Sequence, residues 1–332
     1  MRTSTLFLAL VVLALGGLAG AAQERGAVRL TGNTGIHDPT MTAVAGGFVA
    51  FGTGVELAPD GGAIRLKTST DGIAWADAGT LTQGLPEWIA AELGFSPRNI
   101  WAPSISMRAG VHYLYYSASS FGVNTSAIGL ATNDSLDLAR PAEGWTDRGL
   151  ALRSHRPDNF NAIDPARIDS GDGRAWLAFG SFWDGIRLVE LDPVSGLRRG
   201  NEAPIRLASR GGGAIEAPSI IYQDAWFYLF VSFDRCCAGL ASTYRVMVGR
   251  ARDVTGPYAD AAGVPMLDGG GTELVATQGR YVGPGGQEAI RTPAGDVLVF
   301  HYYDREAGGA PKLQIMPIEW GADGWPHIGV LP

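Results

Sequence analysis

Three carboxylates in this chain stand one or two residues before a proline: Asp38 in "HDP", Asp164 in "FNAIDPARI" and Glu216 in "IEAP". Carboxyl groups are common general acids and bases, and two of them can divide these roles when their surroundings separate their pKa values. An acid before proline can also be a simple turn signal, because Asp tolerates turn geometry and Pro fixes φ. A catalytic interpretation therefore requires an architecture that brings the three together.

A repeated motif supplies that architecture. Taking Asp38, Ser104, Asp164, Glu216 and Gln287 as equivalent positions gives intervals of 66, 60, 52 and 71 residues. Each unit runs from the motif through a short strand and a tight polar turn, such as "AGG", "GDG" or "AGD", to a strongly apolar strand. Units of this length hold four short strands, and four-stranded sheets repeated around an axis form a β-propeller.

The sequence thus predicts an all-β fold, a five-bladed β-propeller in a single domain over residues 23–332. A β-sandwich would explain the strands but not their fivefold recurrence. Only residues 86–93, "PEWIAAEL", suggest a short helix. Innermost propeller strands line the axis, so Asp38, Asp164 and Glu216 should converge. Bringing several negative charges together costs electrostatic free energy, and such clusters are usually found at catalytic sites.

The amino-acid composition and net charge limit the classes of molecule that this protein can bind. The 332 residues are 46% hydrophobic and 18% charged, with a net charge of −7 and no run of Lys or Arg. Nucleic acids demand a basic surface, so they are excluded as partners, and a neutral or sparsely charged substrate is favoured. We expect a monomer without a membrane partner.

The first 22 residues have the pattern of a secretory signal peptide, with one early Arg, an apolar run and small residues before a cleavage site near Ala21 or Ala22. The apolar run from Leu6 to Leu15 is short for an uncleaved membrane anchor. The mature protein is therefore expected to be secreted, either extracellular or periplasmic. The two cysteines, Cys236 and Cys237, are adjacent, and both a vicinal disulfide and two free thiols remain open.

An ordered set of motifs over roughly residues 30–328 resembles glycoside hydrolase family 43 and its arabinan endo-1,5-α-L-arabinanases. The motifs are "HDPT", "NAIDPA", "GSFWDGI", "IEAPSI", "CC", "TYRVMVGRARDVTGPY", "FHYYD" and "GWP". The resemblance implies a five-bladed propeller that cleaves internal α-1,5-L-arabinofuranosidic bonds of plant cell-wall arabinan or arabino-oligosaccharides.

The resemblance also implies roles for the carboxylates. Asp38 matches the general base that activates water, and Glu216 matches the general acid that protonates the leaving oxygen. Asp164 matches a third carboxylate that orients the acid and raises its pKa. The family inverts configuration, which places base and acid about 6.5–9.5 Å apart to admit a water.

Further positions follow from the same motifs. The residues implied in substrate binding are Trp101, Phe121, Asn161, Ser181, Trp183 and His37. His301 in "FHYYD" matches a histidine that reaches one Ca²⁺, or another cation, held mostly by water in the central channel. Two departures from the family pattern are Ser104, where Asp is common, and Gly286-Gln287, where His-Asn is common.

Three alternatives remain. One is an exo-acting α-L-arabinofuranosidase or β-xylosidase on the same scaffold, which differs in loop shape. The second is a sialidase-like propeller, suggested by the Asp-box-like "STDGIAW" at 69–75 but lacking a recognisable arginine triad. The third is a non-catalytic glycan-binding propeller, which would need the aromatic residues but not three acids.

Overall fold

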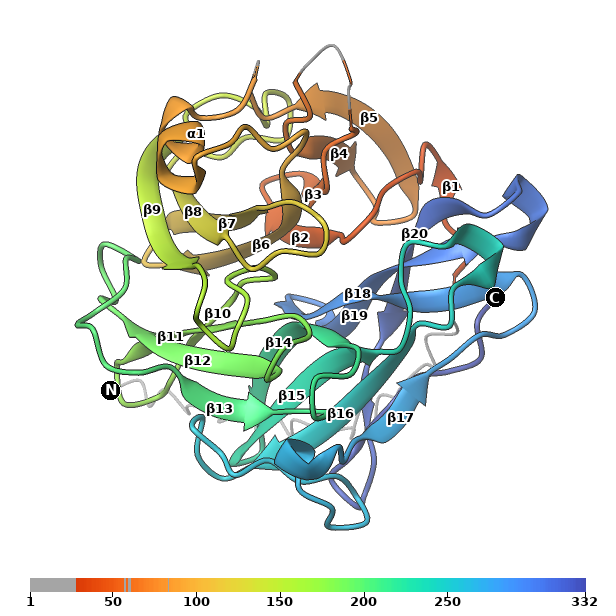
Figure 1. The fold of residues 1–332 in the computed structure, drawn as a ribbon. Coiled ribbons are helices and arrows are strands. Elements are labelled where there is room, and N and C mark those ends of the chain that lie inside the picture. The colour runs from red at the N-terminus through yellow and green to blue at the C-terminus, as the bar shows by residue number, and fades with distance from the viewer. Residues whose placement is uncertain (1–27, 57, 59–60, 83) are drawn as a thin grey trace, which may run out of the picture.

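A computed structural model describes residues 28–56, 58, 61–82 and 84–332. The predicted signal peptide, residues 1–22, lies outside the described residues. Five largely antiparallel sheets follow one another along the chain and are arranged in a ring (Figure 1). The predicted five-bladed β-propeller is therefore confirmed.

Each blade is built from consecutive strands. Blade I holds β1 (Thr31–Gly32), β2 (Thr40–Val44), β3 (Gly47–Gly52), β4 (Arg65–Ser69) and β5 (Ala74–Thr80), and blade II holds β6 (Trp101–Arg108), β7 (Val111–Ala118), β8 (Ser126–Asn133) and β9 (Thr146–Ser154). Blade III holds β10 (Ala166–Asp169), β11 (Ala175–Phe179), β12 (Ile186–Leu191) and β13 (Ile205–Ala208). Blade IV holds β14 (Ile215–Gln223), β15 (Trp226–Phe233), β16 (Arg245–Ala251) and β17 (Thr272–Val275), and blade V holds β18 (Tyr281–Thr292), β19 (Gly295–Asp304) and β20 (Ala310–Pro317). A small sheet pairs β21 (Glu319–Trp320) with β22 (Pro326–His327).

Helical structure is sparse. The α-helix α1 (Glu87–Leu93) falls on the segment where a helix was expected, buries Ile89 and Leu93, and ends at Gly94 in the left-handed conformation. Three single turns complete the helices of the described residues: η1 (Gly239–Ala241), η2 (Met266–Asp268) and η3 (Arg305–Ala307). Within the described part of the chain, every helix is too short or too polar to cross a membrane.

The core is divided between the blades. Buried hydrophobic side chains of the described residues form five clusters, and each cluster joins two neighbouring blades. Strand β15 shows how alternation achieves this: Leu229, Val231 and Phe233 face blade III, whereas Tyr228 and Phe230 face blade V. Because successive side chains point to opposite faces, each central strand supplies two interfaces.

The N-terminal segment joins the first blade to the last. Thr31 in β1 pairs in parallel with Ala74 of β5. Three residues later, the Thr34 carbonyl accepts a 2.8 Å hydrogen bond from the backbone N–H of Leu313 in β20. Ile36 is buried in the cluster between blades I and V. This segment therefore ties blade I to blade V.

The structure corrects the register of the repeat. Five residues at the start of the inner strands have a positive φ between 39° and 56°: Asp38, Ala102, Asp164, Ala217 and Gly286. The first four precede a proline, and Gln287 follows the fifth. The predicted equivalence of Ser104, Glu216 and Gln287 with Asp38 and Asp164 is therefore wrong, because Glu216 lies one residue before the turn and Ser104 two residues after it.

Candidate active site

One open cleft contains the three predicted carboxylates. Asp38, Asp164 and Glu216 all line a cavity of about 890 Å³ at one end of the propeller axis. Asp38 and Asp164 reach it from the left-handed turns that precede β2 and β10, whereas Glu216 is the second residue of β14. The chain thus delivers carboxyl groups from blades I, III and IV to one place.

A recurrent hydrogen bond between blades fixes the turns. At four of the five interfaces, the N–H of the left-handed residue donates to a side chain near the end of the strand that pairs with the inner strand of the preceding blade. The pairs are Ala102 with Thr53 Oγ1 (2.9 Å), Asp164 with Ser117 Oγ (2.9 Å), Gly286 with Ser232 Oγ (3.0 Å) and Asp38 with His301 Nδ1 (3.1 Å).

The interface between blades III and IV departs from this pattern. Ser181, which occupies the corresponding strand end, donates its hydroxyl to Glu216 Oε2 at 2.7 Å. The N–H of Ala217 donates instead to Asp164 Oδ2 at 3.0 Å. The Asp164 carboxylate therefore holds the backbone directly after Glu216, which is what an orienting residue for the acid would do.

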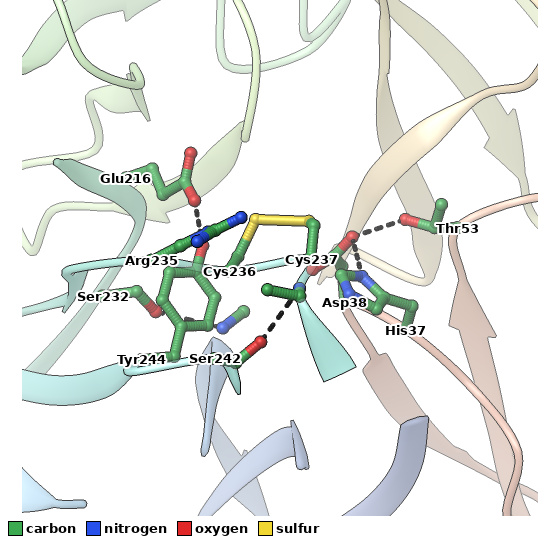
Figure 2. Close-up of a disulfide and its surroundings, with 12 residues drawn as sticks. His37, Asp38, Thr53, Glu216, Ser232, Arg235, Cys236, Cys237, Ser242 and Tyr244 are labelled. Atoms are coloured by element: carbon green, nitrogen blue, oxygen red, sulfur yellow. Dashed lines mark hydrogen bonds and ion pairs between the residues drawn. A yellow bond between two sulfur atoms is a disulfide. The ribbon is translucent and has the colours of Figure 1, made fainter. Parts of the chain in front are cut away.

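Asp38 is surrounded by groups that stabilise its ionised form. Its Oδ2 atom accepts hydrogen bonds from Thr53 Oγ1 at 2.6 Å and from His37 Nδ1 at 2.7 Å, and the first of these is drawn in Figure 2. Burial alone raises the pKa of a carboxyl group, but His37, His301 and Thr53 together outweigh burial and hold the pKa of Asp38 well below its ordinary value. Asp38 is thus ionised and able to accept a proton.

Glu216 is shifted in the opposite direction. Its side chain is almost fully buried and accepts a hydrogen bond from the Tyr244 hydroxyl at Oε1 (Figure 2). Burial raises the pKa of Glu216, the bonds from Tyr244 and Ser181 lower it in part, and the negative charge of Asp38 raises it again. Burial, followed by the charges of Glu216 and Asp38, also raises the pKa of Asp164. A proton is therefore retained in the Glu216–Asp164 pair while Asp38 is ionised.

An ionised carboxylate and a protonated carboxyl group in one open cleft suit acid–base hydrolysis. The glycosyl hydrolases family 43 model matches residues 31–326. The chain belongs to glycosyl hydrolases family 43.

Relatives of this family 43 chain include enzymes of both modes of attack. The extracellular endo-α-(1→5)-L-arabinanase 1 of Bacillus subtilis is 43% identical over 291 residues, covering 88% of this chain and 87% of the relative. The extracellular exo-α-(1→5)-L-arabinofuranosidase ArbA of Cellvibrio japonicus is 36% identical, covering 88% and 86%. The solved family 43 endo-arabinanase of Bacillus licheniformis is 42% identical with a TM-score of 0.83, covering 90% of this chain and 99% of its own.

The predicted substrate-binding residues of this family 43 chain all line the same cleft: His37, Trp101, Phe121, Asn161, Ser181 and Trp183. The rings of Trp101 and Phe121 lie 5.0 Å apart, and Phe121 is 76% exposed, so the pair presents an apolar face to solvent. Asn161 is buried and uses its Oδ1 to accept a hydrogen bond from Ser126 Oγ. The Ser181 hydroxyl is used by Glu216.

Three residues that bond to side chains of the cleft were not identified from the sequence. Thr53 and Tyr244 bond directly to Asp38 and Glu216, and Tyr303 bonds to His37. A signal for Thr53 did exist, because "FGTG", "YYSA", "FGSF" and "FVSF" each end a second strand with a hydroxyl residue. The tyrosines carry no such local signal, since Tyr244 is 28 residues from Glu216 in the chain and Tyr303 is 266 residues from His37.

The predicted metal residue of this family 43 chain, His301, lies beside two other possible ligands. His37, Asp38 and His301 place their ligand atoms within 4.8 Å of one another. Calcium prefers oxygen ligands, and Asp38 alone supplies oxygen here. Burial, together with the nearby charge of His37, lowers the pKa of His301 and keeps the ring neutral.

Because Nδ1 of His301 accepts the Asp38 N–H, the proton of the neutral ring is on Nε2, which is buried without a hydrogen-bond partner among the described residues. A ring nitrogen that carries a proton can donate a hydrogen bond to a water molecule, but it has no free lone pair with which to bind a cation directly. The residues therefore fit a cation only through intervening water.

Proposed function

We propose that this protein hydrolyses internal α-1,5-L-arabinofuranosidic bonds of arabinan with inversion of configuration. One observation carries the proposal: Asp38 and Glu216 line the same cleft with pKa values shifted in opposite directions. Relatives named as enzymes that act on α-1,5-linked arabinose polymers support the substrate class. The endo mode is inferred from the similarity to the endo-arabinanase of Bacillus subtilis, which is 43% identical.

The mechanism needs a single displacement. Protonated Glu216 gives its proton to the glycosidic oxygen as the bond to the anomeric carbon breaks. Asp38 removes a proton from a water molecule on the opposite face of the sugar, and the water oxygen bonds to that carbon. Asp164 keeps the backbone at Ala217, and with it Glu216, in register. Proton exchange with solvent then restores both carboxyl groups.

The cleft walls suit a sugar chain. Trp101 and Phe121 offer apolar ring faces of the kind on which sugar rings pack, and the exposed Phe182 and the half-buried Trp183 also line the cleft. We infer a neutral polysaccharide substrate, because the cleft supplies more apolar than cationic surface.

The function is tested by incubating the protein with linear arabinan, branched arabinan and xylan while product lengths are followed. We expect mixed short arabino-oligosaccharides from linear arabinan. A Glu216→Gln variant should lose at least about 100-fold in kcat, since it lacks the general acid. Glu319→Gln, at an exposed glutamate in β21, is the matched control and should retain full activity. Arabinose as the only product would overturn the endo mode, and xylose products would overturn the substrate.

We also propose export and a water-held cation. The predicted signal peptide and the extracellular relatives support export of the mature chain. The buried Nε2 of His301, without a partner among the described residues, supports a cation that it contacts through water. If a cation binds there, CaCl₂ should raise the melting temperature of EDTA-treated protein, and His301→Gln should abolish the increase. Equal stabilisation of both proteins would contradict this site.

A further inference from the structure

The two adjacent cysteines form a disulfide in the catalytic cleft. Cys236 and Cys237 are bonded to each other in the loop between β15 and η1. Both line the cavity that holds Asp38 and Glu216. In Figure 2 the sulfur–sulfur bond lies between Glu216 on one side and the His37–Asp38 pair on the other. A bridge between neighbouring residues cannot connect distant parts of the fold, so its effect must be local.

A chain of hydrogen bonds leads from this disulfide to Asp38. The backbone N–H of Cys237 donates to the Tyr303 hydroxyl at 2.7 Å. The same hydroxyl lies 2.8 Å from His37 Nε2, and His37 Nδ1 lies 2.7 Å from Asp38 Oδ2. These residues come from blade IV, blade V and the turn before blade I, so the chain crosses two blade interfaces.

The chain engages both ring nitrogens of His37. The Tyr303 oxygen accepts from the Cys237 N–H and also bonds to His37 Nε2. The other ring nitrogen, Nδ1, faces Asp38 Oδ2. His37 also stacks on His301 with ring centroids 3.7 Å apart, which restricts its rotation. The imidazole is thus held in one orientation.

The disulfide holds the first donor in place. Cys237 has a φ of 57°, in the left-handed region that non-glycine residues seldom occupy. Such a conformation is unfavourable for a residue with a side chain and persists where the surroundings enforce it. The eight-membered ring closed by the disulfide restricts this backbone. Ala238, the next residue, is fixed separately by its N–H bond to Ser242 Oγ at 3.0 Å.

We propose that Tyr303 is a positioning residue for the base Asp38, acting through His37, and that the Cys236–Cys237 ring keeps Tyr303 in that role. The inference rests on the proposed function of Asp38 as the general base. The ring undergoes no redox step during the reaction. Its task is to direct one backbone N–H at one hydroxyl.

The test is a mutant cycle read as kcat and KM on linear arabino-oligosaccharides. Tyr303→Phe removes only the hydroxyl, and the Cys236→Ser/Cys237→Ser pair opens the ring. Each should lower kcat roughly 10- to 100-fold with little change in KM, as for small displacements of a catalytic group. Combining all three substitutions should lower kcat no further than Tyr303→Phe alone, because both changes break one chain.

The proposal would be overturned if the kcat losses of Tyr303→Phe and of the cysteine pair multiplied in the combined variant. A rise in KM without a fall in kcat would also overturn it and would assign the ring to substrate contact. Full activity of Tyr303→Phe would also overturn it. Tyr302→Phe, at the neighbouring buried tyrosine, is the matched control and should leave kcat unchanged. If the cysteine variant does not fold, the disulfide can instead be reduced with a water-soluble phosphine in the folded wild-type and Tyr303→Phe proteins. Reduction should lower kcat in the wild type only. Equal falls of kcat in both proteins would overturn the proposal.

The proposed function and this inference can be tested separately. An active Asp38→Asn variant would overturn the role of Asp38 as the base. An inactive Asp38→Asn variant beside a fully active Tyr303→Phe would overturn the positioning role alone.

Discussion

Asp38 and Glu216 are carboxyl groups in one cleft, yet their protonation differs because their partners differ. Asp38 is next to two imidazole rings and the Thr53 hydroxyl, which favour its anion. Glu216 accepts bonds from two neutral hydroxyls, but burial and the nearby negative charge of Asp38 outweigh them. The difference in protonation therefore depends on His37, which is next to Asp38 in sequence, and on side chains far from each carboxylate in sequence: Thr53, His301, Ser181 and Tyr244.

Tyr244→Phe should move the alkaline limb of the pH–kcat profile to higher pH. The Tyr244 hydroxyl bond lowers the pKa of Glu216, so its removal raises that pKa further. A general acid works below its pKa, and a higher pKa therefore extends activity upward in pH. Tyr258→Phe, at another buried tyrosine, whose hydroxyl bonds to the Val254 carbonyl, serves as the control and should not shift the profile. A limb that stays fixed or moves down in Tyr244→Phe would contradict the assignment of Glu216 as the acid.

The inner strands begin with a left-handed residue that is usually followed by proline. The proline pattern let the sequence predict five blades and the meeting of Asp38 with Asp164. It also misled, because the proline of blade IV follows Ala217 and not Glu216. Tyr244 and Tyr303 could not be placed, because Tyr244 bonds to a residue 28 positions away and Tyr303 bonds to a residue of another blade, and no local pattern encodes either contact.

Gly286 provides a test of how closely the blades approach at the axis. A Cβ atom at Gly286 would lie 2.4 Å from Asp38 Oδ1, so Gly286→Ala should displace the base and lower kcat by at least about 10-fold. Gly279 has the same φ of 56° and open space around it. Gly279→Ala should therefore cost about 1 kcal/mol of stability and leave kcat unchanged. Equal kcat values for the two variants, measured beside thermal unfolding, would argue against the close approach of blade V to Asp38.

The ring as a whole depends on the contact between its first and last blades. Residues 31–36 reach both β5 and β20, and Ile36 packs with Leu313 and Val299 of blade V. The sequence predicted the number of blades but not how the ring closes, because β1 is two residues long and pairs through its backbone. The catalytic cleft opens on the axis, so its geometry requires a closed ring.

Ile36→Ala should destabilise the whole propeller. Ile36 is 4% exposed, and removing its buried atoms is expected to cost about 2–4 kcal/mol in the free energy of unfolding. Ile73→Ala makes the same chemical change at a side chain that is 38% exposed and should cost less than about 1 kcal/mol. Denaturant unfolding followed by fluorescence checks both. Similar losses from the two variants would show that the contact between blades I and V contributes little.

The stereochemistry of the first product tests the account most directly. Proton NMR of a linear α-1,5-arabino-oligosaccharide, recorded immediately after addition of the enzyme, distinguishes the anomers before mutarotation mixes them. Direct attack of water activated by Asp38, with proton donation from Glu216, predicts that the β-anomer of the new reducing end appears first. Initial release of the α-anomer would require a covalent intermediate and would contradict the proposed roles of both carboxylates.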